Sequence, residues 1–416
     1  MSDEALRQAA LAYHAMPRPG KIGTHVFKPA ESSRDLALAY SPGVAEPVLA
    51  IAADPEAAYE YTNKGNLIGI VTDGSAILGL GNLGALASKP VMEGKALLFK
   101  RFADLDCVDI EINAETAESF IDTVARIADS FGGINIEDVG APQCFAIEEA
   151  LKARCKVPVF HDDQHGTAIC VVAGLLNALE LQGKRLNEVK IVCLGSGAAG
   201  TATLRLLRSM GVPVANMTAV DRQGVIHAGR ENLPDYKAEF ANESRHRTLA
   251  DALRGADVFI GVSAAGLLDA ELLRSMAPRP VIFALANPEP EVRPSAARAI
   301  RDDVIVATGR SDFPNQVNNV LCFPFIFRGA LDVRAHAITE EMKIAAAHAI
   351  ANLTKEAVPE EVIKAYPDVT GLTFGPEYIL PKPMDPRLRE VVASAVAKAA
   401  IASGVAGKAY PSHYLK

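Results

Sequence analysis

The chain has 416 residues, which is enough for two or three domains that each bury a core of their own. Hydrophobic residues make up 49% of the chain and charged residues 22%, and this composition excludes disordered and collagen-like proteins. The formal net charge of -8 lacks the basic excess that nucleic-acid binding requires, so we expect no nucleic acid among the partners.

The chain begins with a short amphipathic helix, expected at about residues 4–14, and the connector MPRPGKIG follows at residues 16–23. Proline and glycine break regular structure in this connector. We therefore expect residues 1–24 to form an arm that lies outside the core.

Several features point to a cytoplasmic protein. The N-terminus has no basic segment followed by an apolar one, and no run of about 18 apolar residues occurs anywhere, so neither a secretion signal nor a membrane span is expected. The six cysteines are scattered without a C-x-x-C pair and should remain reduced.

Short apolar runs alternate with helical stretches from about residue 67, which predicts a parallel sheet covered by helices. A long apolar helix at about 166–182, ending at Gly183, should join two domains. A second strand and helix series follows, and the chain is mostly helical from about residue 339. We predict an α/β fold made of an arm, a substrate and metal-binding α/β domain, a Rossmann-like doubly wound dinucleotide-binding domain, and a helical segment that packs back, at residues 1–24, 25–164, 165–335 and 336–416.

A glycine-rich loop follows the predicted strand at residues 189–194 and opens a helix; it reads Gly195, Ser196, Gly197, Ala198, Ala199 and Gly200. Its glycines suit a tight turn, close approach to a pyrophosphate and close packing. Any tight strand-to-helix turn can use glycine, but here an acid, Asp221, also ends the next strand, where it would bind the adenosine ribose. This context predicts a dinucleotide site. Asp221 favours NAD and the adjacent Arg222 favours NADP, so both cofactors stay open.

Two acidic pairs follow predicted strands, Glu137 with Asp138 after GINI and Asp162 with Asp163 after VPVF. Because strand ends at one sheet edge can converge, three such carboxylates could form a hard oxygen site for Mg²⁺ or Mn²⁺. A solvated loop or a helix cap would explain one pair, but explains two less well.

The histidines His161 and His165 flank the second acidic pair and could suggest zinc or iron. The segment HDDQHG lacks the H-E-x-x-H spacing, so we do not expect these histidines to be ligands.

Two further side chains are candidates for proton transfer. Lys95 lies among apolar neighbours in MEGKALLFK, where burial would lower the pKa of its ammonium toward that of a useful base. Most lysines in such runs only extend their charged end to water. Tyr40 precedes a Ser-Pro-Gly turn and suits either an acid or a packing residue.

Seven motifs in a fixed order resemble the malic enzymes, in the short bacterial form that also occurs as the N-terminal part of fusion proteins with a phosphotransacetylase-like extension. The likeness runs from about residue 20 to 404. The motifs are AYSPGVAEP, VTDGSAILGLGNLG, PVMEGKALLFKRFADLD, NIEDVGAPQCF, VFHDDQHGTA, FALANPEPE and NQVNNVLCFP.

The resemblance implies that Tyr40 is the general acid and Lys95 the general base, with Asp162 tuning the lysine. It implies three metal ligands, namely Glu137, Asp138 and Asp163. The resemblance also implies that the amides of Asn287 and Asn319 contact the substrate, with Asn318 beside Asn319. Asn287 is implied to contact the cofactor as well.

The reaction implied is the oxidative decarboxylation of (S)-malate to pyruvate and CO₂ with reduction of NADP or NAD, of which we favour NADP, and with Mg²⁺ or Mn²⁺ as the metal. Two other readings are a hydroxy-acid dehydrogenase that releases no CO₂, and a non-catalytic nucleotide or metabolite sensor. The family also implies a homodimer or larger homo-oligomer, in which the arm at residues 16–23 could embrace a second subunit.

One position departs from the family pattern. Eukaryotic relatives carry a carboxylate-binding arginine where this chain has Ala76. In the absence of this arginine, loop amides near Gly79–Gly84 are the candidates to hold the second carboxylate of malate.

Overall fold

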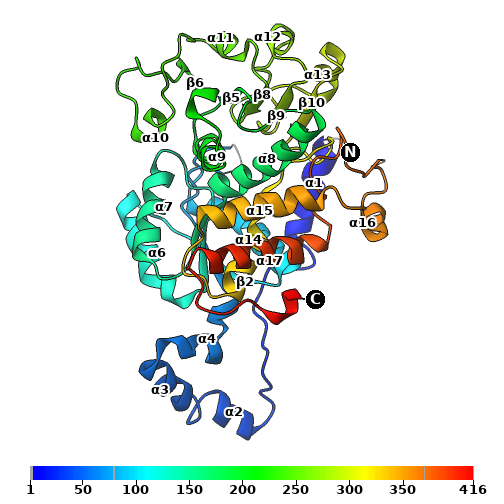
Figure 1. The fold of residues 1–416 in the computed structure, drawn as a ribbon. Helices are drawn as coiled ribbons and strands as arrows, with labels where there is room; N and C mark the ends of the chain where they lie inside the picture. Colours follow the sequence, from blue (N-terminus) through cyan, green and yellow to red (C-terminus); the bar gives the residue numbers. More distant parts are fainter. Residues whose placement is uncertain (1–2, 78–79, 370, 416) are drawn as a thin grey trace.

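The structure is a computed structural model that describes residues 3–77, 80–369 and 371–415. The structure contains two sheets whose strands are mostly parallel, and helices accompany each sheet. The two sheets lie one above the other in Figure 1. The predicted α/β class is thus confirmed.

The first sheet has the strand order β2-β1-β3-β4, and all of its strands are parallel. Inner strands β1 and β3 are almost wholly buried, as expected for a parallel sheet that helices cover on both faces. The strands are β1 (Leu67–Thr72), β2 (Asp106–Glu111), β3 (Gly133–Ile136) and β4 (Val159–His161), and the helices are α5 (Ala85–Leu98), α6 (Ala117–Ile127) and α7 (Gln143–Arg154).

The second sheet has the order β10-β9-β8-β5-β6-β7 and confirms the doubly wound arrangement. Only β7 is antiparallel to its neighbour β6. The chain proceeds in opposite directions from β5, first to β6 and then to β8, and ligands bind at such a switch point. The strands are β5 (Ile191–Leu194), β6 (Met217–Asp221), β7 (Gly224–Val225), β8 (Val258–Gly261), β9 (Val281–Ala284) and β10 (Ile305–Thr308), and the helices are α9 (Ala198–Ser209), α10 (Asp235–Ala238), α11 (Leu249–Leu253), α12 (Ala270–Ser275) and α13 (Pro294–Ile300).

Helix α8 (Asp162–Leu181) joins the two sheets, and one buried apolar cluster includes side chains from both sheets and from α8. The expected start near residue 166 was wrong, because β4 ends at His161 and the helix begins at the next residue. Asp162 and Asp163 therefore occupy the first helical turn. The predicted end is confirmed, since Gly183 follows the C-cap with φ of 61°.

The C-terminal part is helical and packs against the rest of the chain, as expected. Helix α15 packs on α8, and α17 packs on both α14 and α15. The helices are α14 (Phe323–Asp332), α15 (Glu340–Leu353), α16 (Glu360–Ala365) and α17 (Arg387–Ala402).

The N-terminal part contains the expected first helix, α1 (Asp3–Ala15), and the connector lies against α5 of the same chain through hydrogen bonds of Lys21 to Glu93 and Pro90. The next segment projects from the body as a separate lobe at the bottom of Figure 1. Its helices are α2 (Ser33–Ala39), α3 (Ala45–Ala53) and α4 (Ala58–Tyr61), and none of them has a buried residue.

Among the described helices, none has the length and hydropathy needed to cross a bilayer. The domain boundaries placed at residues 24, 164 and 335 stay predictions.

We expect Phe327→Ala to lower the free energy of unfolding by about 3–5 kcal/mol, because the buried ring contacts Phe99 and Phe160 at centroid distances of 5.5 and 5.8 Å and its loss leaves a cavity. Urea unfolding followed by circular dichroism measures the change. Leu86→Ala, at an exposed position of α5, is the control and should change stability by less than about 0.5 kcal/mol. A loss below about 1 kcal/mol for Phe327→Ala would contradict the packing described.

Candidate active site

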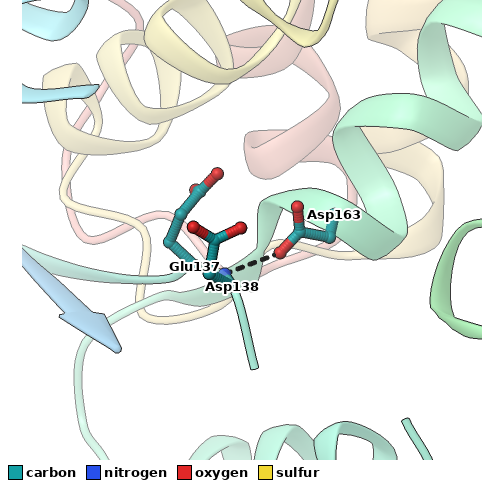
Figure 2. Close-up of side chains that lie close together, drawn as sticks. All are labelled: Glu137, Asp138 and Asp163. Carbon is teal, nitrogen blue, oxygen red and sulfur yellow. Dashed lines mark hydrogen bonds between the residues drawn. The ribbon is translucent and has the colours of Figure 1, made fainter. Parts of the chain in front are cut away.

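Three carboxylates meet where β3 ends and α8 begins (Figure 2). Glu137 and Asp138 directly follow β3, and Asp163 lies in the first turn of α8. One oxygen of each lies within 4.8 Å of the others. The backbone N–H of Asp138, a residue in the left-handed region with φ of 53°, donates a hydrogen bond of 2.8 Å to Asp163 Oδ2. The structure thus brings together the carboxylates that the sequence suggested.

The donor set fits a hard divalent cation. All three groups offer carboxylate oxygens, which Mg²⁺ and Mn²⁺ prefer. The Oδ1 atom of the neighbouring Asp162 is buried and has no hydrogen-bond partner within the described part of the chain. Burial and the surrounding carboxylates also hold the pKa of Glu137 well above its usual range, against the effect of Lys95. A cation would relieve this crowding of negative charge.

Lys95, on α5, points into the same cluster. Its Nζ atom lies 2.6 Å from Asp162 Oδ2 and 2.8 Å from Glu137 Oε1, and its side chain is only 10% exposed. The ring of Phe323 lies beneath the ammonium at 4.1 Å. The expectation of a lowered pKa was wrong for this arrangement, because burial alone would lower the pKa of Lys95 but the two carboxylates outweigh burial and raise it.

Of the three predicted amides, Asn319 lies at this cluster. Its Nδ2 donates to Asp162 Oδ2 at 3.1 Å, and Thr167 Oγ1 donates to its Oδ1 at 3.0 Å. Asn318 instead caps a short 3₁₀ helix by accepting from the N–H of Val320. Asn287 is exposed beyond the end of β9. The roles of all three toward a substrate stay predictions.

The three-carboxylate group does not include either histidine, although His161 Nδ1 lies 3.7 Å from Asp163 Oδ2. His165 Nε2 lies 2.8 Å from Glu148 Oε1, and burial lowers the pKa of His165 to about 4. His161 Nε2 lies 3.3 Å from the carbonyl oxygen of Val139. Both rings are thus placed as packing and hydrogen-bonding groups.

The glycine-rich loop turns sharply after β5. Gly195 has φ of 114°, and a Cβ at Gly200 would lie 1.9 Å from the carbonyl oxygen of Gly195. Nothing lies within 4 Å of a Cβ built at Gly197, so its backbone faces open space at the start of α9. A phosphate could approach there, where helix N–H groups are available.

A cavity of about 630 Å³ connects this loop to the end of β6. It is lined by Gly195, Ser196, Gly197, Asp221 and Arg222 among others, and also by Ala141, three residues after Asp138. An apolar cluster in the domain of the first sheet contains Val139 and side chains of α6 and α7, and Ala198 packs against this cluster. The loop and the carboxylates are therefore close neighbours.

Asp221 is heavily engaged within the chain itself. Arg230 donates to both of its oxygens, at 2.9 and 3.1 Å, and Lys237 Nζ lies 2.7 Å from Oδ2. The adjacent Arg222 is exposed at the same cavity.

Tyr40 does not lie beside Lys95 of the same chain. It ends α2 in the projecting lobe, with 76% of its surface exposed, and Figure 1 shows α2 far from α8. The sequence motif around Tyr40 carries no information on this separation.

The loop near Ala76 adjoins the carboxylates. The N–H of Ala76 donates to the carbonyl oxygen of Asp138 at 3.0 Å, and Ser75 Oγ accepts from the N–H of Gly140 at 2.8 Å. Part of the predicted carboxylate-binding loop, residues 78–79, lies outside the described residues. The rest of that expectation stays a prediction.

Several contacting residues were missed at the level of sequence: Thr167 and Phe323 at the carboxylates, and Arg230 and Lys237 at Asp221. The first two lie inside the motifs VFHDDQHGTA and NQVNNVLCFP, so the motifs could have drawn attention to them. Arg230 follows β7 in an irregular segment and Lys237 lies in the short helix α10, and neither position carries a comparable signal.

Comparison with known proteins agrees with this geometry. The family description "Malic enzyme, NAD binding domain" matches residues 164–373, and "Malic enzyme, N-terminal domain" matches residues 19–119. A relative from Halomonas elongata named "NADP-dependent malic enzyme" is 61% identical over 99% of this chain and 97% of its own length. An "NAD-dependent malic enzyme" from Rhizobium meliloti is 55% identical over 96% of this chain, which spans about half (52%) of that longer relative. The solved malic enzyme of Pyrococcus horikoshii has a TM-score of 0.90 at 43% identity, covering 99% of this chain and 94% of its own.

We expect Glu137→Gln to weaken Mn²⁺ binding by at least roughly 10- to 100-fold, the loss that removal of a supporting group around a metal typically causes. Titration calorimetry of the metal alone measures this effect. Glu149→Gln on the exposed side of α7 is the matched control and should bind Mn²⁺ as the unmodified chain does. Equal affinity for all three proteins would remove Glu137 from the ligand set.

Proposed function

The chain belongs to the malic enzyme family, and on that premise we propose that it catalyses the oxidative decarboxylation of (S)-malate to pyruvate and CO₂ while reducing NAD(P)⁺. The observation that carries this proposal is the position of Lys95 Nζ, between Asp162 and a carboxylate of the three-acid group. A dehydrogenase that releases no CO₂ has no need for that group.

We propose that Glu137, Asp138 and Asp163 hold a divalent cation, because one oxygen from each lies within 4.8 Å of the other two. Such a cation supplies Lewis-acid catalysis for the negative charge that develops when CO₂ leaves. Lys95 is the group placed to take the proton of the C2 hydroxyl. Its ammonium must first lose a proton, and Asp162, 2.6 Å away and with its second oxygen buried, is the adjacent acceptor.

We propose that Asn319 orients this pair, since it donates to Asp162 and accepts from Thr167. A fixed Asp162 keeps Nζ of Lys95 aimed in one direction. Asn287 is proposed to reach the nicotinamide end of the cofactor and the substrate from beyond β9, on the same sheet edge as the glycine-rich loop.

The cofactor and domain assignments are proposals of the same kind. NADP is the proposed dinucleotide, because the acid at the end of β6 already pairs with two cations. The boundaries at residues 24, 164 and 335 are proposed because the first sheet spans residues 67–161 and the second spans 191–308.

We expect Lys95→Ala to lower kcat for pyruvate formation by about 10²- to 10⁴-fold, the usual contribution of a positioned acid or base. Pyruvate, CO₂ and reduced cofactor are measured with malate, either dinucleotide, and Mg²⁺ or Mn²⁺ present or absent. Lys89→Ala is the control on the same helix, where the lysine pairs with Asp109 and Glu111 instead.

Near-normal turnover of Lys95→Ala would refute its role as the base. Reduction of the dinucleotide without release of CO₂ would instead indicate a simple hydroxy-acid dehydrogenase. Binding of the dinucleotide with no turnover of malate would indicate a sensor.

We propose that the protein is a homodimer in which the lobe of one subunit brings Tyr40 to the carboxylates of the other. Tyr40 would then protonate C3 of the product enolate there. Two features support the proposal. Helix α2, which Tyr40 ends, lies far from α8, whose first residue Asp162 pairs with Lys95, and apolar side chains are exposed on the same lobe. Exposed apolar surface of this kind is typical of an interaction site. The apolar side chains are Leu36, Leu38, Val48 and Leu49.

Mixing two inactive variants tests the shared site. We expect Tyr40→Phe and Lys95→Ala each to have little activity alone, whereas a refolded equimolar mixture recovers up to about a quarter of normal activity, since half of the subunit pairs are mixed and each mixed pair has one intact site. Tyr61→Phe in α4 is the control and should be active alone. Absence of recovery in a sample shown to contain mixed dimers would place Tyr40 in the site of its own chain.

A further inference from the structure

We infer that Glu291 is a positioning residue for the nicotinamide end of the dinucleotide, because its buried carboxylate ties the loop after β8 to the loop that carries Asn287. The inference rests on the proposed function, in which Asn287 reaches the nicotinamide and the substrate. Glu291 is fully buried, so it acts through the backbone of these loops and does not touch either ligand.

The carboxylate of Glu291 joins the two loops by accepting hydrogen bonds from their backbones. Its Oε1 accepts from the N–H of Ser263 at 3.1 Å, and its Oε2 accepts from the N–H of Ala286 at 3.1 Å. Ser263 lines the cofactor cavity just after β8, and Ala286 directly precedes Asn287 after β9. Because β8 and β9 are parallel neighbours, both loops leave the same edge of the sheet. One side chain therefore fixes the backbone beside Asn287 relative to a wall of the cofactor cavity.

The backbone around Glu291 takes part in the same connection. The N–H of Gly266 donates to the carbonyl oxygen of Pro290 at 3.2 Å, and the N–H of Leu268 donates to the carbonyl oxygen of Glu291 at 3.2 Å. The segment that carries Glu291 is thus attached to the loop after β8 by its backbone as well as by its side chain. Its carboxylate is consequently held in one place between the loops.

The last residue of β8 leaves the space that this carboxylate occupies. A Cβ at Gly261 would lie 2.4 Å from Cδ and 2.5 Å from Oε1 of Glu291, and atoms cannot approach so closely without a shift. Glycine permits the close approach because it has no side chain. The end of β8 is therefore shaped around the carboxyl group.

A carboxylate is a destabilising choice for a buried position without a cation. Burial raises the pKa of Glu291, although the backbone N–H groups that it accepts from lower it. Within the part of the chain that the structure describes, Glu291 forms no ion pair; Arg293 and Arg310 contact this loop but pair with the partly exposed Glu289. A buried polar group of this kind calls for an explanation beyond packing. Its position beside Asn287 supplies one.

A role in stability alone is the competing explanation. A tie between the two loops could hold the sheet together without any effect on the reaction. Such a role would lower the free energy of unfolding of a Glu291 variant but leave ligand binding and turnover of the folded protein unchanged. A positioning role instead affects the nicotinamide end of the dinucleotide and spares the adenosine end.

The first test compares ligand binding by Glu291→Gln and by the unmodified chain. The amide keeps the size of the side chain but turns an NH₂ group toward one of the two N–H donors, so one hydrogen bond is lost. Calorimetry should show about 10-fold weaker binding of NAD⁺ or NADP⁺, whichever the chain binds more tightly, because the lost bond involves a charged group. ADP-ribose, which carries the pyrophosphate but no nicotinamide, should bind as it does to the unmodified chain.

Kinetics provide the second test. With malate and Mn²⁺, Glu291→Gln should lower kcat by about 10- to 100-fold, the loss that a misplaced contact group can cause. Asn287→Ala should also lower kcat, and the double variant should lose little more than Asn287→Ala alone, since Glu291 acts through Asn287. Glu289→Gln is the matched control in the same loop and should behave like the unmodified chain, because its carboxylate pairs at the surface.

Unchanged dinucleotide binding and unchanged kcat in folded Glu291→Gln would overturn the inference. Equal losses for the dinucleotide and for ADP-ribose would overturn it too, as would additive losses in the double variant. If Glu291→Gln does not fold, Gly261→Ala displaces the carboxylate while keeping its charge, and the same selective loss is expected; its absence would overturn the inference.

The outcomes for the inference and for the proposed function are separate. A chain that forms pyruvate equally well with and without Glu291→Gln would keep the proposed function and refute the positioning role. A chain that shows the selective loss of dinucleotide binding in Glu291→Gln but forms no pyruvate would refute only the proposed function.

Discussion

The ion pairs of Lys95 are the interaction on which the site depends. A single ammonium joins α5 to the end of β3 through Glu137 and to the start of α8 through Asp162. All three side chains are nearly inaccessible to water, so removing one partner would leave a buried charge without compensation, which costs several kcal/mol. The same contacts that hold the elements in place therefore fix the geometry of the reacting groups.

Helix α8 carries this constraint to the cofactor side. Its first turn supplies Asp162 and Asp163, and its buried length shares one core with the second sheet. The negative side chains at its start also suit the positive end of the helix dipole. Since Ala141 and the glycine-rich loop line one cavity, the loop and the carboxylates are neighbours on either side of the helix that joins the two sheets.

Local patterns predicted the parts of the site that lie where strands end. The glycine-rich loop, the acidic pairs and the α/β architecture follow from short stretches whose spacing fixes their position. The start of α8 was misplaced because apolar periodicity becomes visible only after its polar first turn. The raised pKa of Lys95 depends on carboxylates far away in sequence. The partners of Asp221 come from an irregular segment and from the short helix α10. Neither feature could be predicted locally. The location of Tyr40 depends on how a whole lobe is placed, which no local motif encodes.

The pairing of Asp221 with Arg230 and Lys237 has an evolutionary consequence. These cations lie on a peripheral segment between β7 and α10 and in α10 itself, away from the three carboxylates and Lys95 of the proposed catalytic site. Under the proposed choice of dinucleotide, substitutions in this segment alter the surroundings of Asp221 and leave the carboxylates and Lys95 in place. Evolution can therefore vary this part of the cavity separately from the proposed catalytic groups.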